Sequence, residues 1–128
     1  MKVAFSLYDF VDEDGESVIS SWRSGLTTRS VARLDSKLHM LEISGPTLGP
    51  KLLAGPIKKT RHIYKLIIHA DVMLRPMLCK GPFQMETEFT LLVGAKEIQG
   101  RLIPGPESAV ANRTTLLANG KRRKAHVW

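Results

Sequence analysis

The chain has 128 residues, of which 43% are hydrophobic and 24% are charged, and its formal net charge is +7. This length suits one domain with a hydrophobic core and is too short for two independent domains. The single cysteine, Cys79, excludes an internal disulfide framework and favours a reducing compartment. The charge is uneven, because residues 1–56 contain six Lys and Arg against seven Asp and Glu, whereas residues 57–128 contain thirteen against five. Such a basic half is typical of a surface that binds a polyanion, most often nucleic acid.

The hydropathy pattern predicts no membrane segment. The apolar start of the chain reaches Asp9 too soon for a signal peptide, and no apolar run approaches about 18 residues. We therefore expect a soluble protein of the cytoplasm that does not contact a membrane.

The first elements are a strand and a helix. Val3, Phe5, Leu7 and Phe10 follow an alternating pattern that predicts a strand, which the acidic turn at 12–15 would end. In the helix that follows, Asp14 is the expected cap, Val18, Ile19 and Trp22 have helical spacing, and Gly25 is the expected end.

A second helix is predicted directly afterwards, with Thr27 or Thr28 as its cap. Val31, Leu34, Leu38 and Leu41 form one apolar stripe at helical spacing. The two helices should form a hairpin over residues 16–42 whose apolar faces need a further layer to cover them.

The middle of the chain predicts a sheet. Three Gly-Pro pairs between residues 44 and 57 indicate a connection. Three strand-like runs follow at 63–69, 72–79 and 88–94, and they predict an antiparallel meander within residues 61–95, with Ala70 and Asp71 as the first hairpin turn. Pro76 cannot donate to a ladder, so the second run should be bulged or paired on one side only.

The chain then predicts a short helix from Ser108 to Ala118, after Pro104 and Pro106, and a basic tail at 121–128. The elements together predict an α+β fold: a single domain over residues 1–120 and a tail from 121 to 128.

Patterns of catalytic or metal-binding residues are missing from the sequence. There is no CxxC, no pair of histidines at ligand spacing, no GxSxG and no phosphate-binding GxxxxGK[ST] loop. We therefore expect neither a metal nor a cofactor.

Basic residues on and beside the predicted sheet are the remaining candidates. They are Lys58, Lys59, Arg61, Lys65, Arg75, Lys80, Lys96 and Arg101, and the tail adds Lys121, Arg122, Arg123 and Lys124. Arg75 shares a strand face with apolar residues, where a charge is costly without a partner. It either pairs with a carboxylate such as Glu88 or binds a phosphate.

The order of these elements resembles the RelE/HigB-like toxins, in particular their phage-derived branch, over about residues 15–118. The resemblance rests on Ile63-Tyr64-Lys65-Leu66, Val72-Met73-Leu74-Arg75 and Phe89 to Lys96 as successive strands, followed by a helix that begins with proline. It implies a small α+β domain and, in active members, cleavage of messenger RNA at the ribosome. By position it implies that Arg75 holds the scissile phosphate and that Lys96 assists. His69 and Tyr64 are the candidates for proton transfer.

Two functions from different classes remain open. One is a toxin that acts as a metal-independent endoribonuclease, in which the 2′-hydroxyl of the RNA attacks the adjacent phosphate, with the RNA or ribosome and an antitoxin protein as partners. The alternative is a non-catalytic phage structural or assembly protein, in the host cytoplasm or the virion, which binds other virion proteins and nucleic acid. The remaining cations named above would contact nucleic acid in either case.

Overall fold

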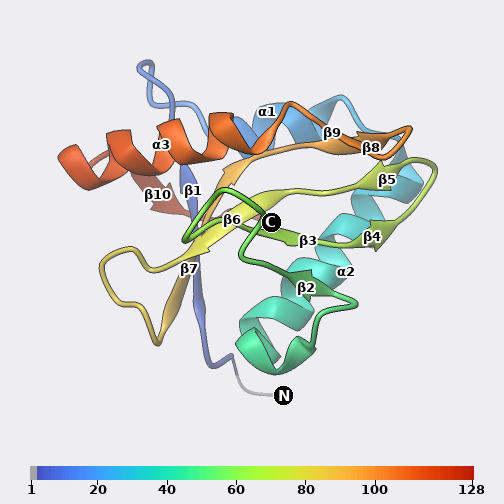
Figure 1. Ribbon diagram of the computed structural model, residues 1–128, viewed down its shortest axis with the longest axis horizontal. Coiled ribbons are helices and arrows are strands. Elements are labelled where there is room, and N and C mark those ends of the chain that lie inside the picture. Colours follow the sequence, from blue (N-terminus) through green and yellow to red (C-terminus); the bar gives the residue numbers. More distant parts are fainter. Residues whose placement is uncertain (1–2) are drawn as a thin grey trace.

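The computed structural model describes residues 3–128 and shows an α+β fold of three layers (Figure 1). A helical hairpin lies on one face of the main sheet, and a third helix lies on the other face. The helices are α1 (Val18–Ser24), α2 (Thr28–Ser44), the 3-10 helix η1 (Gly45–Leu48) and α3 (Pro106–Ala118). None of the helices in the described residues is both long enough and apolar enough to span a membrane.

Two sheets hold the strands. The six-stranded sheet has the order β10 (Arg123–Ala125), β1 (Ser6–Phe10), β7 (Glu88–Val93), β6 (Met77–Lys80), β3 (Tyr64–Leu66) and β2 (Leu53–Ala54). The four-stranded sheet has the order β4 (Ile68–His69), β5 (Met73–Leu74), β8 (Lys96–Ile98) and β9 (Arg101–Ile103). Among the strands of residues 3–128, only β1 and β7 pair in parallel.

The predicted meander is confirmed, and it runs through both sheets. Each of its three segments is interrupted once, at Ile67, at Arg75-Pro76 and at Gly94-Ala95. Each segment therefore contributes one strand to the six-stranded sheet and one to the four-stranded sheet. The interruption at Pro76 agrees with the missing donor of proline, and the pairing of β6 with β7 shifts register between Met77 and Leu78.

The helical hairpin packs through three of the four residues of the predicted stripe, because Val31 is only half-buried and lies outside the core cluster. Leu34, Leu38 and Leu41 of α2 are fully buried, and they belong to one core cluster with Leu78 and Leu91 of the sheet. On the opposite face, α3 buries Ala109 and Leu116 in a second cluster with Met77, Cys79 and Leu92.

Several local predictions need correction. The cap of α1 is Ser17, whose hydroxyl accepts from the Ser20 amide, because the Asp12 carboxylate already holds the amides of Asp14 and Glu16 in the preceding turn. Thr27 caps α2, as one of the two candidates. His69 pairs with Met73, so the first hairpin loop consists of Ala70, Asp71 and Val72 and is one residue longer than expected. The loop at 44–57 also contains η1 and β2.

The basic tail is part of the fold. Its β10 pairs antiparallel with β1 along the edge of the six-stranded sheet, with Tyr8 opposite Ala125 and Phe10 opposite Arg123. Residues 121–128 therefore belong to the same domain and are not an appended tail.

Candidate nucleic-acid interface

Arg75 is held inside the protein. Its side chain lies where β5 passes into β6, and the residue is only 5% exposed. Its Nη1 donates to the Leu74 carbonyl oxygen at 2.9 Å, and its Nε lies 3.4 Å from Oε1 of Glu97. The expected carboxylate partner thus exists, but it is Glu97 and not Glu88. A guanidinium group in this position stabilises the bend between the two sheets and is poorly placed to meet a phosphate.

Of the other predicted catalytic residues, Lys96 lies beside Arg75 in the sheet, whereas His69 and Tyr64 are placed elsewhere. Lys96 on β8 pairs in register with Leu74, next to Arg75 in the chain. His69 is exposed at the far end of β4, whereas Tyr64 lies in the other sheet opposite Leu78. His69 lies five positions after Tyr64, which is about 16 Å along extended chain at roughly 3.3 Å per residue. The four residues therefore do not form one catalytic cluster.

Glu88 pairs instead with Arg123 of β10. The Arg123 guanidinium group forms a two-pronged bond with the Glu88 carboxylate and stacks over the ring of Tyr8 at 3.8 Å and over Phe83 at 4.8 Å. Arg122 donates from Nε to the Val11 carbonyl oxygen at 3.1 Å. These two arginines hold the edge strand in place, while Lys121 and Lys124 are exposed to solvent.

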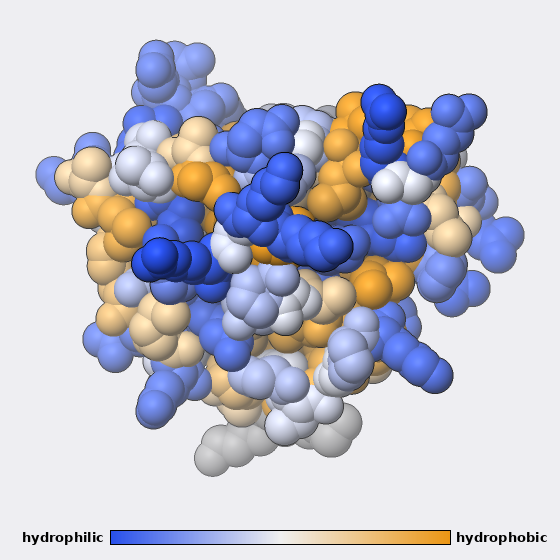
Figure 2. Space-filling view, viewed as in Figure 1, coloured by the Kyte–Doolittle hydropathy of each residue, from blue (hydrophilic) through white to orange (hydrophobic). Residues whose placement is uncertain are grey.

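The exposed cations gather instead at residues 57–63, which we call the basic loop. Figure 2 shows strongly hydrophilic side chains grouped over the middle of the face where α3 and this loop lie side by side in Figure 1. Lys58, Lys59 and Arg61 are exposed there, and none of them forms an ion pair among residues 3–128. The remaining predicted contacts are more dispersed: Lys65 on β3, Lys80 with Nζ 5.2 Å from the centre of the Tyr64 ring, and Arg101 on the outer strand β9.

Local hydrogen bonds fix the shape of the basic loop. The Ile57 amide donates to the Ile63 carbonyl oxygen at 2.8 Å, and the Thr60 amide and hydroxyl both donate to the Ile57 carbonyl oxygen. Lys59 has a φ of 68°, which is uncommon for a residue with a side chain. The turn is therefore a defined platform that directs several cations toward solvent.

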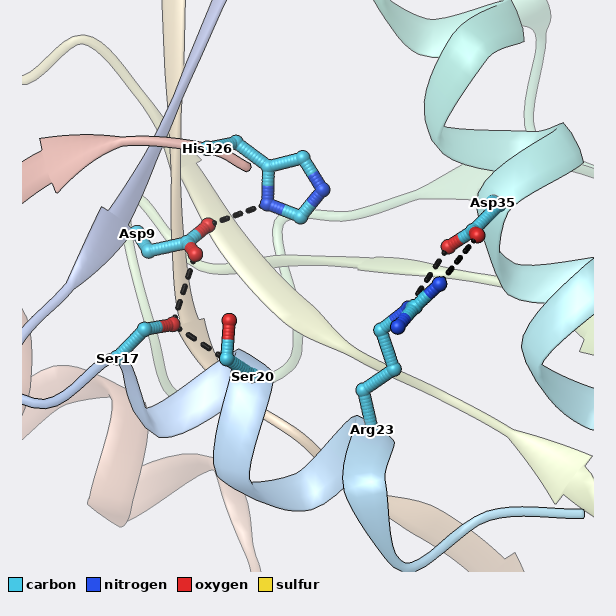
Figure 3. Close-up of polar contacts among 6 residues, drawn as sticks. All are labelled: Asp9, Ser17, Ser20, Arg23, Asp35 and His126. Atoms are coloured by element: carbon cyan, nitrogen blue, oxygen red, sulfur yellow. Dashed lines mark hydrogen bonds and ion pairs between the residues drawn. The ribbon is translucent and has the colours of Figure 1, made fainter. Parts of the chain in front are cut away.

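A buried polar network joins β1 to the segment after β10 and to the cap of α1 (Figure 3). Oδ1 of Asp9 on β1 lies 2.7 Å from Nδ1 of His126, and Oδ2 of Asp9 accepts from the Ser17 hydroxyl at 2.7 Å. Serine, histidine and aspartate are the residues of a hydrolase triad, but here the serine proton is directed at the carboxylate and not at the imidazole. The network therefore holds β1, α1 and the segment after β10 together, and Ser17 is not arranged as a nucleophile.

Neither the cysteine thiol nor the possible metal ligands of the described residues form a reactive site. Burial raises the pKa of the Cys79 thiol to about 11, against a smaller opposite effect of the nearby Arg113, so the thiol stays protonated at neutral pH. Within the described part of the chain, no group of three His, Cys, Asp or Glu side chains could hold a metal ion.

Sequence reasoning missed Arg113, which lies on α3 beside the basic loop and lines the same cavity as Lys59 and Arg61. The helical spacing of α3 identifies its apolar residues only. No pattern in the sequence indicates that the basic loop packs beside this helix, so Arg113 could not be recognised.

Comparisons with protein-family models, with curated proteins and with solved structures find no match for this chain.

Proposed function

We propose that this protein binds RNA and acts as a RelE/HigB-like toxin directed at messenger RNA on the ribosome. The observation that carries the proposal is the basic loop, where Lys58, Lys59 and Arg61 are exposed and lack carboxylate partners in the described residues. Cations without internal ion pairs can bind the phosphates of a nucleic acid and release the counterions bound there.

Charge and shape both support RNA as the ligand. The loop lies in the basic half of the chain, and its turn is closed by the hydrogen bond from the Ile57 amide to the Ile63 carbonyl oxygen. A preformed platform of this kind loses little conformational entropy on binding, so more of its electrostatic attraction appears as affinity.

The burial of Arg75 changes how cleavage would have to occur. The resemblance implies a cation at the scissile phosphate, and in this structure Arg75 is bonded to Glu97 and to backbone carbonyl groups. We therefore assign the RNA contacts to the basic loop. Whether the bound RNA is cleaved is decided by the expression experiment below.

The first experiment measures binding of a single-stranded RNA oligonucleotide at several salt concentrations. Replacing Lys58, Lys59 and Arg61 with alanine should weaken binding at least tenfold and make the log–log salt dependence shallower by about one unit per lost phosphate contact. The matched control replaces Arg29, Arg33 and Lys51, which are exposed and outside this loop, and should have a much smaller effect. Equal weakening by the two triple variants would contradict the assignment to the loop.

The second experiment expresses the protein in cells that lack any antitoxin. A toxin should stop translation and leave cut messenger RNA, and the triple variant of the basic loop should relieve both effects. Folded protein with intact messages and normal growth would contradict the toxin proposal.

One observation favours the alternative, a non-catalytic phage assembly protein. Ile98 and Ile103 are 50% and 52% exposed on the β8–β9 hairpin, and β9 is an outer strand. Exposed apolar residues on a sheet edge suit contact with another protein chain. Harmless expression, with the protein co-purifying with particles, is the result that this alternative predicts.

A further inference from the structure

A cavity of about 210 Å³ lies between the basic loop and α3. Lys59, Arg61 and His62 line it from the loop, and Arg113 lines it from the helix. Ile63 and Val110 add apolar surface. Carboxylates are absent from the lining that the structure describes, although Glu107 borders a neighbouring cavity of about 320 Å³ that shares Lys59 and Val110.

Arg113 is the unusual member of this set. Its Nε is buried and has no hydrogen-bond partner among the residues that the structure describes. It forms no ion pair with a described carboxylate either, and its nearby partner is the Cys79 thiol, whose pKa it lowers, by charge and by hydrogen bonding, less than burial raises it. Arg113 is half-buried, but a buried donor such as its Nε is costly without an acceptor, and an anion bound in the cavity would supply one.

The other polar groups narrow the choice of ligand. The hydroxyls of Thr60 and Thr114 line the cavity but already donate to the carbonyl oxygens of Ile57 and Val110. The remaining polar side chains of the lining are the cations Lys59, Arg61 and Arg113 and the imidazole of His62. At this volume the cavity is smaller than the roughly 300–1,000 Å³ of sites for drug-sized ligands, so it suits a phosphate with part of its sugar.

We infer that this cavity binds one backbone phosphate of RNA, with Arg113 as the inner ligand and Lys59 and Arg61 at the rim. The inference rests on the proposed function, because it names the subsite through which the basic loop would hold RNA. The planar fork of Arg113 can donate two parallel hydrogen bonds to one phosphate, which a lysine cannot do. Ile63 and Val110 then lie where the ribose would contact the wall.

The test of the cavity observes Arg113 directly. Arginine side-chain ¹⁵N NMR on the full chain follows the Nε–H signal of Arg113 while inorganic phosphate is added at constant ionic strength. We expect a saturable shift of this signal and no shift of the Arg33 signal, since Arg33 is exposed on α2. An Arg113 signal that does not move overturns the inference.

Variants connect the cavity to RNA. Arg113→Leu should weaken RNA binding about tenfold or more, and Arg113→Lys, which keeps the charge but loses the fork, should weaken it by a smaller factor. Arg33→Leu is the matched control and should change it about twofold or less. Circular dichroism confirms folding, and if Arg113→Leu does not fold, Arg113→Lys provides the result.

The outcomes separate the two proposals. If the triple variant of the basic loop loses RNA binding while both Arg113 variants bind as tightly as the unchanged protein, the cavity inference fails and the proposed function stands. If phosphate shifts the Arg113 signal but RNA does not bind, the cavity is an anion site and the proposed function fails.

Discussion

His126 and Asp9 form a buried contact between residues that are 117 positions apart in the chain, with 2.7 Å between Nδ1 and Oδ1. Their side chains are only 2% and 1% exposed. Trp128 meets the His126 ring edge-on and stacks flat on His39 of α2, at a centroid distance of 3.7 Å. These contacts hold the segment after β10 against β1 and α2.

Replacing His126 with alanine should therefore destabilise the protein by about 1–3 kcal/mol, because the buried Asp9 carboxylate loses one of its two hydrogen-bond partners. Urea unfolding followed by circular dichroism measures the change. His69→Ala, at an exposed histidine, is the control and should cost less than about 0.5 kcal/mol. A similar small cost for His126→Ala would mean that the contact does not hold the segment.

The packing of the helical hairpin is tested at Leu38. Leu38→Ala should cost about 2–5 kcal/mol, because the side chain is fully buried between α2 and the sheet. Leu117→Ala removes the same atoms from a side chain of α3 that is 49% exposed, and should cost far less. Equal losses in the two variants would place Leu38 outside the core.

Gly94 lies where the meander bends and where the indole ring of Trp22 approaches the backbone. A Cβ at Gly94 would overlap this ring, so Gly94→Ala should cost about 1–3 kcal/mol through overpacking. Gly25→Ala is the control, since the nearest atom to its added Cβ is the Trp22 carbonyl oxygen at 3.6 Å. In a protein that also carries Trp22→Val, Gly94→Ala should cost much less free energy of unfolding. Equal costs of Gly94→Ala with and without Trp22→Val would mean that the contact is absent.

Two substitutions of Arg75 test whether its role is structural or catalytic. Arg75→Met keeps much of the side-chain volume but removes the donors to Glu97 and to the Leu74 carbonyl, so we expect a loss of about 1–3 kcal/mol and unchanged RNA binding. Arg75→Ala should lose about 2–4 kcal/mol, since it empties the site and leaves carbonyl groups without donors. Loss of RNA cleavage or binding in a folded Arg75→Met protein would instead assign Arg75 to the phosphate.

Cys79 predicts a dependence of stability on alkaline pH. Its thiol has a pKa of about 11 in the folded protein, against an ordinary value of 9.0, because burial disfavours the thiolate. The unfolded chain releases this proton first, so the contribution of Cys79 to the free energy of unfolding should fall as pH rises from 9 to 11. Comparing the protein with Cys79→Ala over this range removes the effect of other groups, and a constant difference would contradict the prediction.

The predictable parts of this fold are those encoded by local spacing. The stripe on α2 repeats at the helical period, and the runs of the meander combine β-branched residues with turn signals, so both could be placed from neighbouring residues alone. The β8–β9 hairpin was missed although it has a signal: Gln99 and Gly100, with φ of 49° and 77°, form the two-residue turn that an X-Gly pair favours.

The candidate site was less predictable because its residues come together through tertiary packing. The sequence singled out Arg75 as a buried charge, but the choice of Glu97 over Glu88 depends on which strands are neighbours. The prediction of a basic tail at 121–128 outside the domain was wrong, because nothing local indicates that this segment pairs with β1. Arg113 becomes a candidate only through the position of α3 beside the basic loop.

The position of β1 affects how the chain can fold. This strand is an inner member of the sheet, yet its partners, β7 and β10, both come from the second half of the chain. The helical hairpin can form from neighbouring residues, but β1 gains its ladder only after a long loop has closed, which slows folding. During synthesis β1 therefore waits with both edges open, and this interval is when the chain is most exposed to pairing with other strands.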